Sequence, residues 1–134
     1  VFSGFFTAGA KYRLEEGRIE VEQEGKFRKL VKDVEHVTFS GAKGVERNQQ
    51  VLYVTERCVM RLTPTGLEVI ELAPGIDLQR DVLDQADFPL QVSTQLKIMD
   101  AGIFRPEPFG LKLPAVEKDD DSCISVAPLA EASL

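Results

Sequence analysis

The amino-acid sequence predicts a strand-rich domain of the α/β class, with an α+β-like order of elements in this segment. Short β-branched and aromatic runs recur along the chain and are separated by turn residues, which is typical of strands. Helical patterns are few and short, and each follows a Ser, Thr or Asp that can cap a helix. The 134 residues are 43% hydrophobic, which suits one domain with a modest core.

The stretch 50–72 is the centre of the predicted fold. Three apolar runs follow one another there: 51–55, 58–62 and 67–72. The charged break Thr55–Arg57 and the turn Thr63–Gly66 join them, and such short links leave no room for crossover helices. We therefore expect a three-stranded antiparallel meander whose first corner carries its charges at the surface.

The start of the chain predicts a buried strand followed by a hairpin. Val1–Phe6 is apolar enough for a central strand, and the small residues Thr7–Ala10 follow it. Small residues at a strand end allow either a ligand or another strand to approach closely, and packing is the commoner reason. Residues 12–22 alternate between apolar and charged side chains around a turn at Glu15–Gly17, which predicts a half-buried hairpin.

Lys26–Val31 predicts the next strand. Its three basic residues can pair with Glu20 and Glu22 across the sheet. Such solvated pairs contribute only about a few tenths of a kcal/mol each. We interpret the basic cluster as a balanced strand face and not as an anion site.

Val34–Phe39 alternates as another strand and carries His36, the only histidine. A general base must lie within hydrogen-bond reach of its nucleophile, and no Ser or Cys nucleophile motif accompanies this residue. We therefore interpret His36 as a structural or edge residue. Ser40 is the expected cap of a short helix over 42–48.

Beyond residue 72 the sequence predicts two helices and one short strand. Asp77 caps a helix over 78–86, whose apolar residues recur at four-residue spacing. Pro89–Val92 follows as a short strand, and Ser93 or Thr94 caps a brief helix that holds Leu96, Ile98 and Met99. The prolines after Arg105 end the ordered domain near Leu113. Residues 114–134 are rich in acidic residues and are expected to form a disordered tail.

Composition excludes several function classes. The net charge is −6 and no basic stripe is present, so neither nucleic acid nor an anionic membrane surface is an expected partner. The two cysteines, Cys58 and Cys123, lie far apart and indicate neither a disulfide framework nor a metal site, which favours a reducing, cytoplasmic location. No apolar run approaches the roughly 20 residues of a membrane span. Because the chain opens on an apolar run without Met, we expect it to be the carboxyl-terminal piece of a longer protein.

Five stretches occur in a characteristic order: 3–9, 34–41, 53–62, 66–77 and 96–100. Together they resemble the carboxyl-terminal end of family I coenzyme A transferases, of the long single-chain acetate or short-chain acyl type. The resemblance runs from Val1 to Phe104. It implies that residues 1–113 form the strand-rich end of an open α/β transferase domain.

The resemblance implies an enzyme that moves coenzyme A from an acyl-CoA to a carboxylate through a glutamyl-CoA thioester. Coenzyme A is then a substrate, and no cofactor or metal is expected. In the family, the nucleophilic Glu and a glycine-rich loop lie upstream of the stretch that resembles Ser3–Gly9. None of the glutamates in this chain, including Glu56, Glu68 and Glu71, therefore inherits the role of the nucleophile.

The role implied for this segment is a scaffold that also forms part of the cleft wall. Open α/β sheets bind ligands beyond the carboxyl ends of their strands, which makes Thr7, Ala8 and Gly9 the expected substrate-binding residues. The implied partners are the remainder of the transferase chain, the acyl-CoA and carboxylate substrates, and further copies in a homo-oligomer. The absent catalytic motif leaves one alternative, an inactive stand-alone binding or assembly domain with the same fold.

Overall fold

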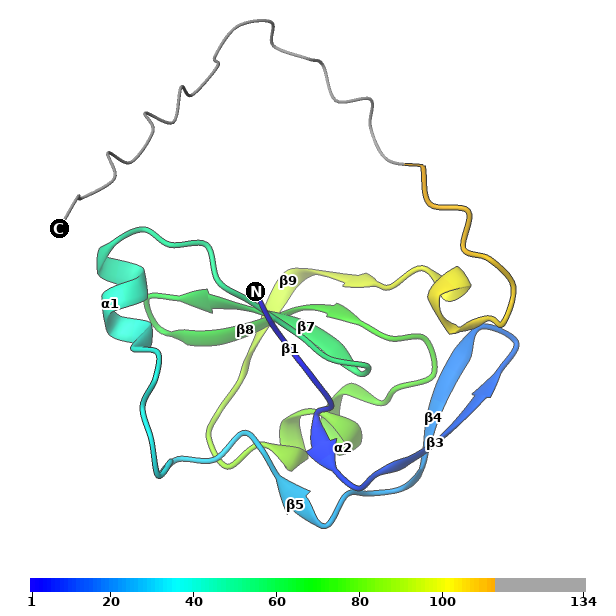
Figure 1. The fold of residues 1–134 in the computed structure, drawn as a ribbon, viewed down its shortest axis with the longest axis horizontal. Helices are drawn as coiled ribbons and strands as arrows, with labels where there is room; N and C mark the ends of the chain where they lie inside the picture. Colours follow the sequence, from blue (N-terminus) through cyan, green and yellow to red (C-terminus); the bar gives the residue numbers. More distant parts are fainter. Residues whose placement is uncertain (113–134) are drawn as a thin grey trace, which may run out of the picture.

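The computed structural model describes residues 1–112, which form a five-stranded mixed sheet and two small two-stranded sheets (Figure 1). The elements are, in chain order, β1 (Phe2–Ser3), β2 (Thr7–Ala8), β3 (Lys11–Glu15), β4 (Arg18–Gln23), β5 (Phe27–Arg28), α1 (Gly41–Glu46), β6 (Leu52–Val54), β7 (Cys58–Thr63), β8 (Gly66–Leu72), α2 (Leu78–Asp81), the 3₁₀ helix η1 (Leu83–Gln85), β9 (Gln91–Ile98) and the 3₁₀ helix η2 (Ala101–Phe104). The large sheet has the order β1-β6-β7-β8-β9. Figure 1 shows α1 at one end of the molecule and the β3–β4 hairpin at the other.

The predicted meander is confirmed. Strands β6, β7 and β8 pair antiparallel, and the turn between the last two closes with a bond from the Thr63 hydroxyl to the Gly66 carbonyl oxygen at 2.8 Å. Met60 and Val69 face each other across β7 and β8 and are fully buried. The meander therefore supplies the centre of the apolar core.

The predicted hairpin is also confirmed. Strands β3 and β4 pair antiparallel, and both turn residues, Glu16 (φ 51°) and Gly17 (φ 78°), adopt the left-handed conformation that a two-residue hairpin turn requires. A Cβ on Gly17 would lie 2.8 Å from the carbonyl oxygen of Ala101. Only glycine therefore fits where the hairpin turn meets η2.

The prediction of Val1–Phe6 as a buried central strand is wrong. Only Phe2–Ser3 is a strand, β1, and it pairs with β6 alone, in parallel, at an edge of the sheet. Phe5 is 66% exposed, while Phe6 leaves the strand and enters the core at 2% exposure. The apolar run therefore contains an edge strand, Phe2–Ser3, and a separate core residue, Phe6. Composition alone does not distinguish the two.

The strand predicted at Lys26–Val31 is shorter and has a different partner. β5 pairs with β2, not with the hairpin, so its basic residues do not face Glu20 and Glu22. Arg28 instead forms an ion pair with Asp87 at 2.8 Å. The turn before β5 redirects the chain because the Glu24 side chain points inward to buried partners.

No strand forms over Val34–Phe39, so that prediction is wrong. The segment bends across the surface, and Val34 (56% exposed) and Val37 (74% exposed) remain in solvent together with His36. Alternation of side chains favours a strand only where a neighbouring strand offers backbone bonds. The helix that follows is confirmed as α1, with the Ser40 hydroxyl accepting from the Lys43 amide at 3.4 Å.

The helix after Asp77 begins as predicted but ends early. Asp77 caps α2 by accepting from the Arg80 amide at 2.7 Å. The carbonyl oxygen of Asp81 accepts from Arg57 at 2.7 Å, and the chain continues as the 3₁₀ helix η1 in place of further α-helix. A tertiary hydrogen bond thus takes an acceptor that a longer helix would have used.

The short strand predicted at Pro89–Val92 overlaps the start of a longer strand, and the helix predicted after Ser93 or Thr94 is wrong. Residues Gln91–Ile98 form one strand, β9, which pairs in parallel with β8. The open edge of β8 offers backbone partners that outweigh the local capping potential of Ser93. The predicted boundary near Leu113 and the predicted tail at 114–134 lie outside the described residues. Among residues 1–112, no helix is long and apolar enough to cross a membrane.

Candidate functional site

The parallel strands β1 and β6 end side by side. The Gly4 amide donates to the Val54 carbonyl oxygen at 3.1 Å, just beyond β1. Two shallow grooves of about 260 and 200 Å³ open at this point, and Phe5 and Thr55 line both of them. Open α/β sheets bind ligands at such carboxyl strand ends. This corner is therefore the candidate site, and the chain continues from it into Phe6 and β2.

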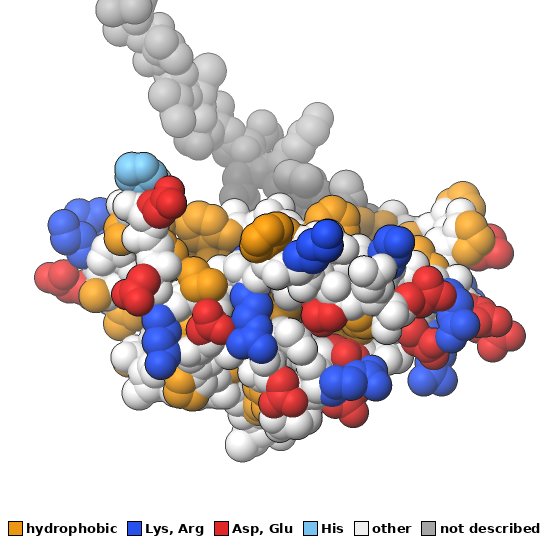
Figure 2. All heavy atoms as spheres, turned by 90° about the horizontal axis from the view of Figure 1, so that it is seen from below, with side chains coloured by type: hydrophobic (Ala, Val, Ile, Leu, Met, Phe, Trp, Pro, Cys, Tyr) orange, Lys and Arg blue, Asp and Glu red, His pale blue; other side chains and the backbone are white. Residues whose placement is uncertain are grey.

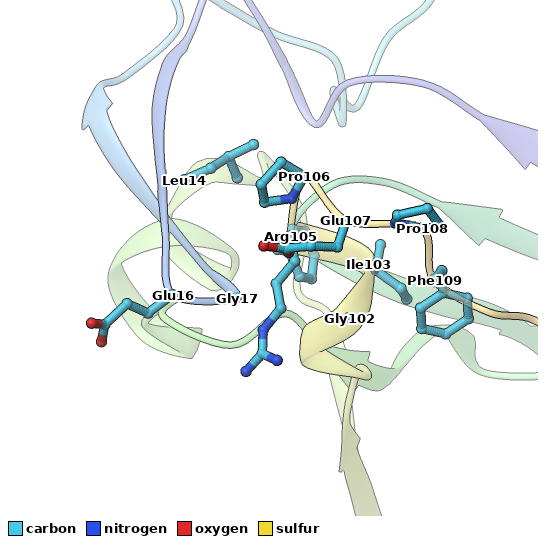
Figure 3. Close-up of a pocket in the computed structure, with 11 residues that line it drawn as sticks. Leu14, Glu16, Gly17, Gly102, Ile103, Arg105, Pro106, Glu107, Pro108 and Phe109 are labelled. Atoms are coloured by element: carbon cyan, nitrogen blue, oxygen red, sulfur yellow. The ribbon is translucent and has the colours of Figure 1, made fainter.

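A larger hollow of about 970 Å³ lies between the β3–β4 turn and the segment after η2 (Figure 3). Figure 3 shows Leu14, Pro106 and Phe109 around it, while the carboxylate of Glu16 points outward. Its charged lining residues are Glu16, Arg105 and Glu107. The residues expected to bind substrate line neither this hollow nor the strand-end grooves, and the grooves are preferred because they open at carboxyl strand ends.

Arg57 lies beneath the candidate site and is completely buried. Its guanidinium forms a bidentate pair with Glu24 at 2.7 and 2.8 Å. It also donates to the Tyr12 hydroxyl at 3.0 Å, the Thr7 hydroxyl at 3.1 Å and the Asp81 carbonyl oxygen at 2.7 Å. Within the described residues, every buried side-chain N or O atom has a hydrogen-bond partner. The buried charge is therefore paired and hydrogen-bonded on all sides, which is the condition under which burying a charge is tolerated.

Two aromatic rings complete the surroundings of Arg57. The guanidinium carbon lies 5.2 Å from the ring centre of Phe6 and 5.5 Å from that of Tyr12. Cations are attracted to the faces of aromatic rings at such distances. Arg57 thereby attaches the chain segment after β1 to the corner between β6 and β7.

Glu56 holds the same segment by its backbone. Its two carboxylate oxygens accept from the Phe6 amide at 3.0 and 3.2 Å, and one of them also accepts from the Tyr12 hydroxyl. The side chain lies 3.5 Å from Arg57 and is 13% exposed. Both oxygens are therefore engaged in structural bonds.

The pKa values in this cluster follow from these contacts. Burial acts to raise the pKa of Glu24, but the hydrogen bonds from Arg57 and Thr7 prevail and lower it to about 2. Burial and the hydrogen bond to Glu56 raise the pKa of Tyr12 to about 12. Burial disfavours the charge on Arg57, yet its bonds to Glu24 and Tyr12 raise its pKa. The cluster is thus a fixed set of charges at neutral pH.

The three expected substrate-binding residues lie together but in different environments. Thr7 is 1% exposed, and its hydroxyl donates to Glu24 at 2.5 Å while it accepts from Arg57. Ala8 is partly exposed, and Gly9 is exposed with φ +83°. The surface that a ligand could reach is therefore formed by Ala8 and Gly9, with Thr7 fixing them from below.

Sequence reasoning missed Arg57 and Glu56. Both were expected in a surface corner, because charged residues between two strands are usually exposed. The structure contradicts this, since the side chain of Arg57 is 0% exposed and that of Glu56 13% exposed. No local sequence pattern indicates that these two residues are buried, because their hydrogen-bond partners lie 24 to 50 positions away in the sequence.

Other candidate groups take no part in this site. His36 is exposed on a bent segment. Burial raises the pKa of the Cys58 thiol to about 12, so it is not a nucleophile at neutral pH. Among residues 1–112, no group of three or more His, Cys, Asp or Glu side chains could hold a metal ion. Figure 2 shows acidic and basic side chains interleaved on the face that it presents, without a basic stripe.

Comparison with known proteins gives the context of this site. No family model matches the chain. Over 111 residues it is 49% identical to a caffeate CoA-transferase of Acetobacterium woodii, which covers 83% of this chain and 21% of that protein. Over 115 residues it is 42% identical to the acetate CoA-transferase YdiF of Escherichia coli K12, covering 85% of this chain and 22% of that protein. The chain thus spans about a fifth of the length of these curated relatives.

The fold agrees with the sequence comparison. A crystal structure of the acyl-CoA transferase YdiF of E. coli O157:H7, in a thioester complex with CoA, matches 84% of this chain and 22% of that chain. The TM-score is 0.80 at 41% identity. The mixed sheet with short helices, predicted from the sequence as part of an α/β domain, is the fold of that enzyme's matching segment. In sequence and in fold, the chain is therefore similar to one segment of these CoA-transferases.

Proposed function

We propose that the full-length protein transfers coenzyme A from an acyl-CoA to a short-chain carboxylate through a glutamyl-CoA thioester. Residues 1–112 would serve as a scaffold and as one wall of the substrate cleft. The observation that carries this proposal is the 0.80 TM-score, at 41% identity, to YdiF in a thioester complex with CoA. Coenzyme A is a substrate in this scheme, and no cofactor is required.

The nucleophile would come from another part of the protein. A nucleophilic carboxylate needs a free oxygen at the reacting carbonyl. At this corner both oxygens of Glu56 accept from the Phe6 amide and both oxygens of Glu24 accept from Arg57, so neither carboxylate could turn to a substrate without breaking these bonds. Their geometry supports a structural role.

The cleft wall would be the exposed surface of Ala8 and Gly9. It follows Phe6, which lines one of the strand-end grooves, and the neighbouring Thr7 side chain is fixed by Arg57 and Glu24. A rigid wall is what a transferase needs in order to use remote binding energy at the reacting centre. Thr7 would act by holding this surface, and its neighbours would contact the substrate.

The carboxylate that accepts coenzyme A would be selected elsewhere. The relatives of this segment are named for two different carboxylates, caffeate and acetate, and both share at least 42% identity with it. A segment that is shared between such enzymes is suited to a common role. We therefore assign it to binding and support of the acyl-CoA, not to discrimination between acceptors.

Assembly and location complete the proposal. The proposed partners are the remainder of the transferase chain and further copies of it in a homo-oligomer. A reducing, cytoplasmic location fits the buried free thiol of Cys58. The similarity to enzymes does not favour the alternative of a stand-alone binding domain.

An isotope-exchange assay on the full-length protein tests the reaction. With acetyl-CoA and labelled acetate alone, a ping-pong transferase moves label into acetyl-CoA without free coenzyme A or a second carboxylate. We expect this exchange. Its absence, or simple hydrolysis of the thioester, would refute the proposed function.

A larger side chain at Ala8 tests whether this residue forms part of the cleft wall. In the full-length enzyme we expect Ala8→Leu to raise KM for acyl-CoA by about tenfold or more, with a smaller change in the carboxylate KM. Glu15→Leu, at a residue whose side chain is 72% exposed on the hairpin, is the matched control and should change neither value. If the two variants had equal KM values for acyl-CoA, Ala8 would not be part of the substrate cleft.

A further inference from the structure

Strand β1 has one side without a partner in the described structure. Its register pairs Phe2 with Tyr53 and Ser3 with Val54, and the Gly4 amide continues the ladder to Val54. Backbone groups in a strand point alternately to its two sides. Since Gly4 bonds to β6, the N–H and C=O groups of Ser3 point away from β6, towards the open edge.

The side chains around this edge are apolar and exposed. Val1 is 86% exposed, Phe2 43% and Phe5 66%. Phe2 stacks on Tyr53, with ring centres 5.1 Å apart, and lies tilted against Phe39 at 5.3 Å, yet 43% of it remains exposed. An aromatic surface of this kind beside unpaired backbone groups favours association with another strand.

The opposite edge of the same sheet differs. Strand β9 carries many polar side chains and a lysine: Gln91, Ser93, Thr94, Gln95 and Lys97. Polar residues and lysine are the means by which sheet edges avoid pairing. The segment 1–6 contains neither a charged residue nor a proline. Strand β9 also exposes Val92 (39%) and Ile98 (63%), so the two edges differ in the polar side chains and the lysine that β9 carries, and not in the presence of exposed apolar residues.

We propose that the free edge of β1 pairs with a β-strand from the part of the full-length protein outside these 134 residues. This inference rests on the proposed function in one respect only, that the chain is part of a longer transferase. The relatives that it matches are several times longer, since it covers 21–22% of them, so most of such a protein is available to cover this edge. Phe2 and Phe5 would then pack against the added strand.

Residue-resolved hydrogen exchange on the full-length protein tests this pairing. The Gly4 amide is the internal control, because β6 protects it in either case. We expect the Ser3 amide to exchange at least about 100-fold more slowly than in an unstructured chain, close to the rate of Gly4. Fast exchange of Ser3 beside a protected Gly4 would overturn the proposal.

Two further results separate the alternatives. If the protection of Ser3 disappears when the protein is diluted to its monomer, the edge is covered by a second copy, and the proposal is wrong. Protection that persists in the monomer supports pairing within one chain. The readout does not require catalysis, so a protein that protects Ser3 but exchanges no acetate would refute the proposed function and leave the strand pairing in place.

Discussion

Arg57 is the residue that joins the largest number of separate elements at the candidate site. From the corner between β6 and β7 it binds Thr7 in β2, Tyr12 in β3, Glu24 after β4 and Asp81 in α2. Removing one partner of a buried ion pair leaves an uncompensated charge in the interior. The planar guanidinium matters as well, because a lysine cannot donate in five fixed directions.

The variant Arg57→Lys should therefore be strongly destabilised. We expect a loss of at least about 2 kcal/mol in the free energy of local opening, because the bidentate pair and the bonds to Thr7 and Tyr12 are lost together. Hydrogen exchange of the β7 amides measures this opening. Arg61→Lys is the control, since its pair with Glu68 is exposed and should change stability by less than about 1 kcal/mol. Equal losses in the two variants would contradict the role given to Arg57.

Glu24 predicts a defined pH dependence. Its pKa in the folded protein, about 2, lies below the ordinary value of 4.5, so folding favours the ionised form. The stabilisation is complete above about pH 4.5 and is lost as the pH falls towards 2. In Glu24→Gln we expect a flatter fall of the thermal midpoint over this range. Glu20→Gln is the control: Arg13 also lowers the pKa of Glu20, but this pair is exposed, so the fall should be flattened less than in Glu24→Gln. A wild-type slope in Glu24→Gln would be inconsistent with the cluster.

At the scale of elements, the corner between β4 and β5 depends on Gly25. A Cβ at this position would lie 2.5 Å from the Thr7 hydroxyl oxygen and 2.6 Å from the Ala8 carbonyl oxygen. Both atoms belong to β2, and the Thr7 hydroxyl also bonds to Glu24 and Arg57 in the buried cluster. The close approach of two backbone segments thus requires glycine here.

We expect Gly25→Ala to cost about 1–3 kcal/mol, because β2 must shift away from the added methyl group. Gly41→Ala is the matched control, since its Cβ would lie 3.5 Å from Leu62 in ordinary contact at the start of α1. That change should be within about 0.5 kcal/mol of wild type. Hydrogen exchange in β2 and β7 measures the stability of the two variants. If Gly25→Ala were as stable as wild type, the close approach of Gly25 to β2 would be disproved.

Elements whose contacts are local could be predicted from the sequence. The meander, the β3–β4 hairpin and the caps at Ser40 and Asp77 depend on residues a few positions apart. Elements that depend on distant partners could not. Strand β9 forms because β8 offers an edge, and α2 ends where Arg57 takes the Asp81 carbonyl oxygen.

The same distinction applies to the candidate site. Small residues after a strand indicated Thr7–Gly9; this segment follows Phe6, which lines one of the strand-end grooves, and does not itself line either groove. Neither alternation nor turn chemistry could indicate that the charged corner at Glu56 and Arg57 folds inward. Inward folding becomes favourable only when Glu24, Tyr12 and the Phe6 amide supply partners from other segments.

At the scale of the whole molecule, the chain is similar to one segment of longer CoA-transferases. It spans about a fifth of its curated relatives, and its own carboxylates at the candidate site are engaged in structural bonds. The sheet edge at β1 and the wall at Ala8 and Gly9 are the two surfaces by which it would meet the rest of the enzyme and the substrate. Both surfaces belong to one short segment, residues 1–9, which contains β1 and the residues that follow it.

The most direct test is to locate the covalent intermediate in the full-length protein. Acyl-CoA is added without acceptor, borohydride reduces the glutamyl thioester to an alcohol with release of coenzyme A, and peptide mass mapping finds the altered glutamate. We expect a single altered glutamate outside residues 1–134, together with unmodified Glu24 and Glu56. An altered glutamate within residues 1–134 would contradict the assignment of this segment to scaffold and cleft wall.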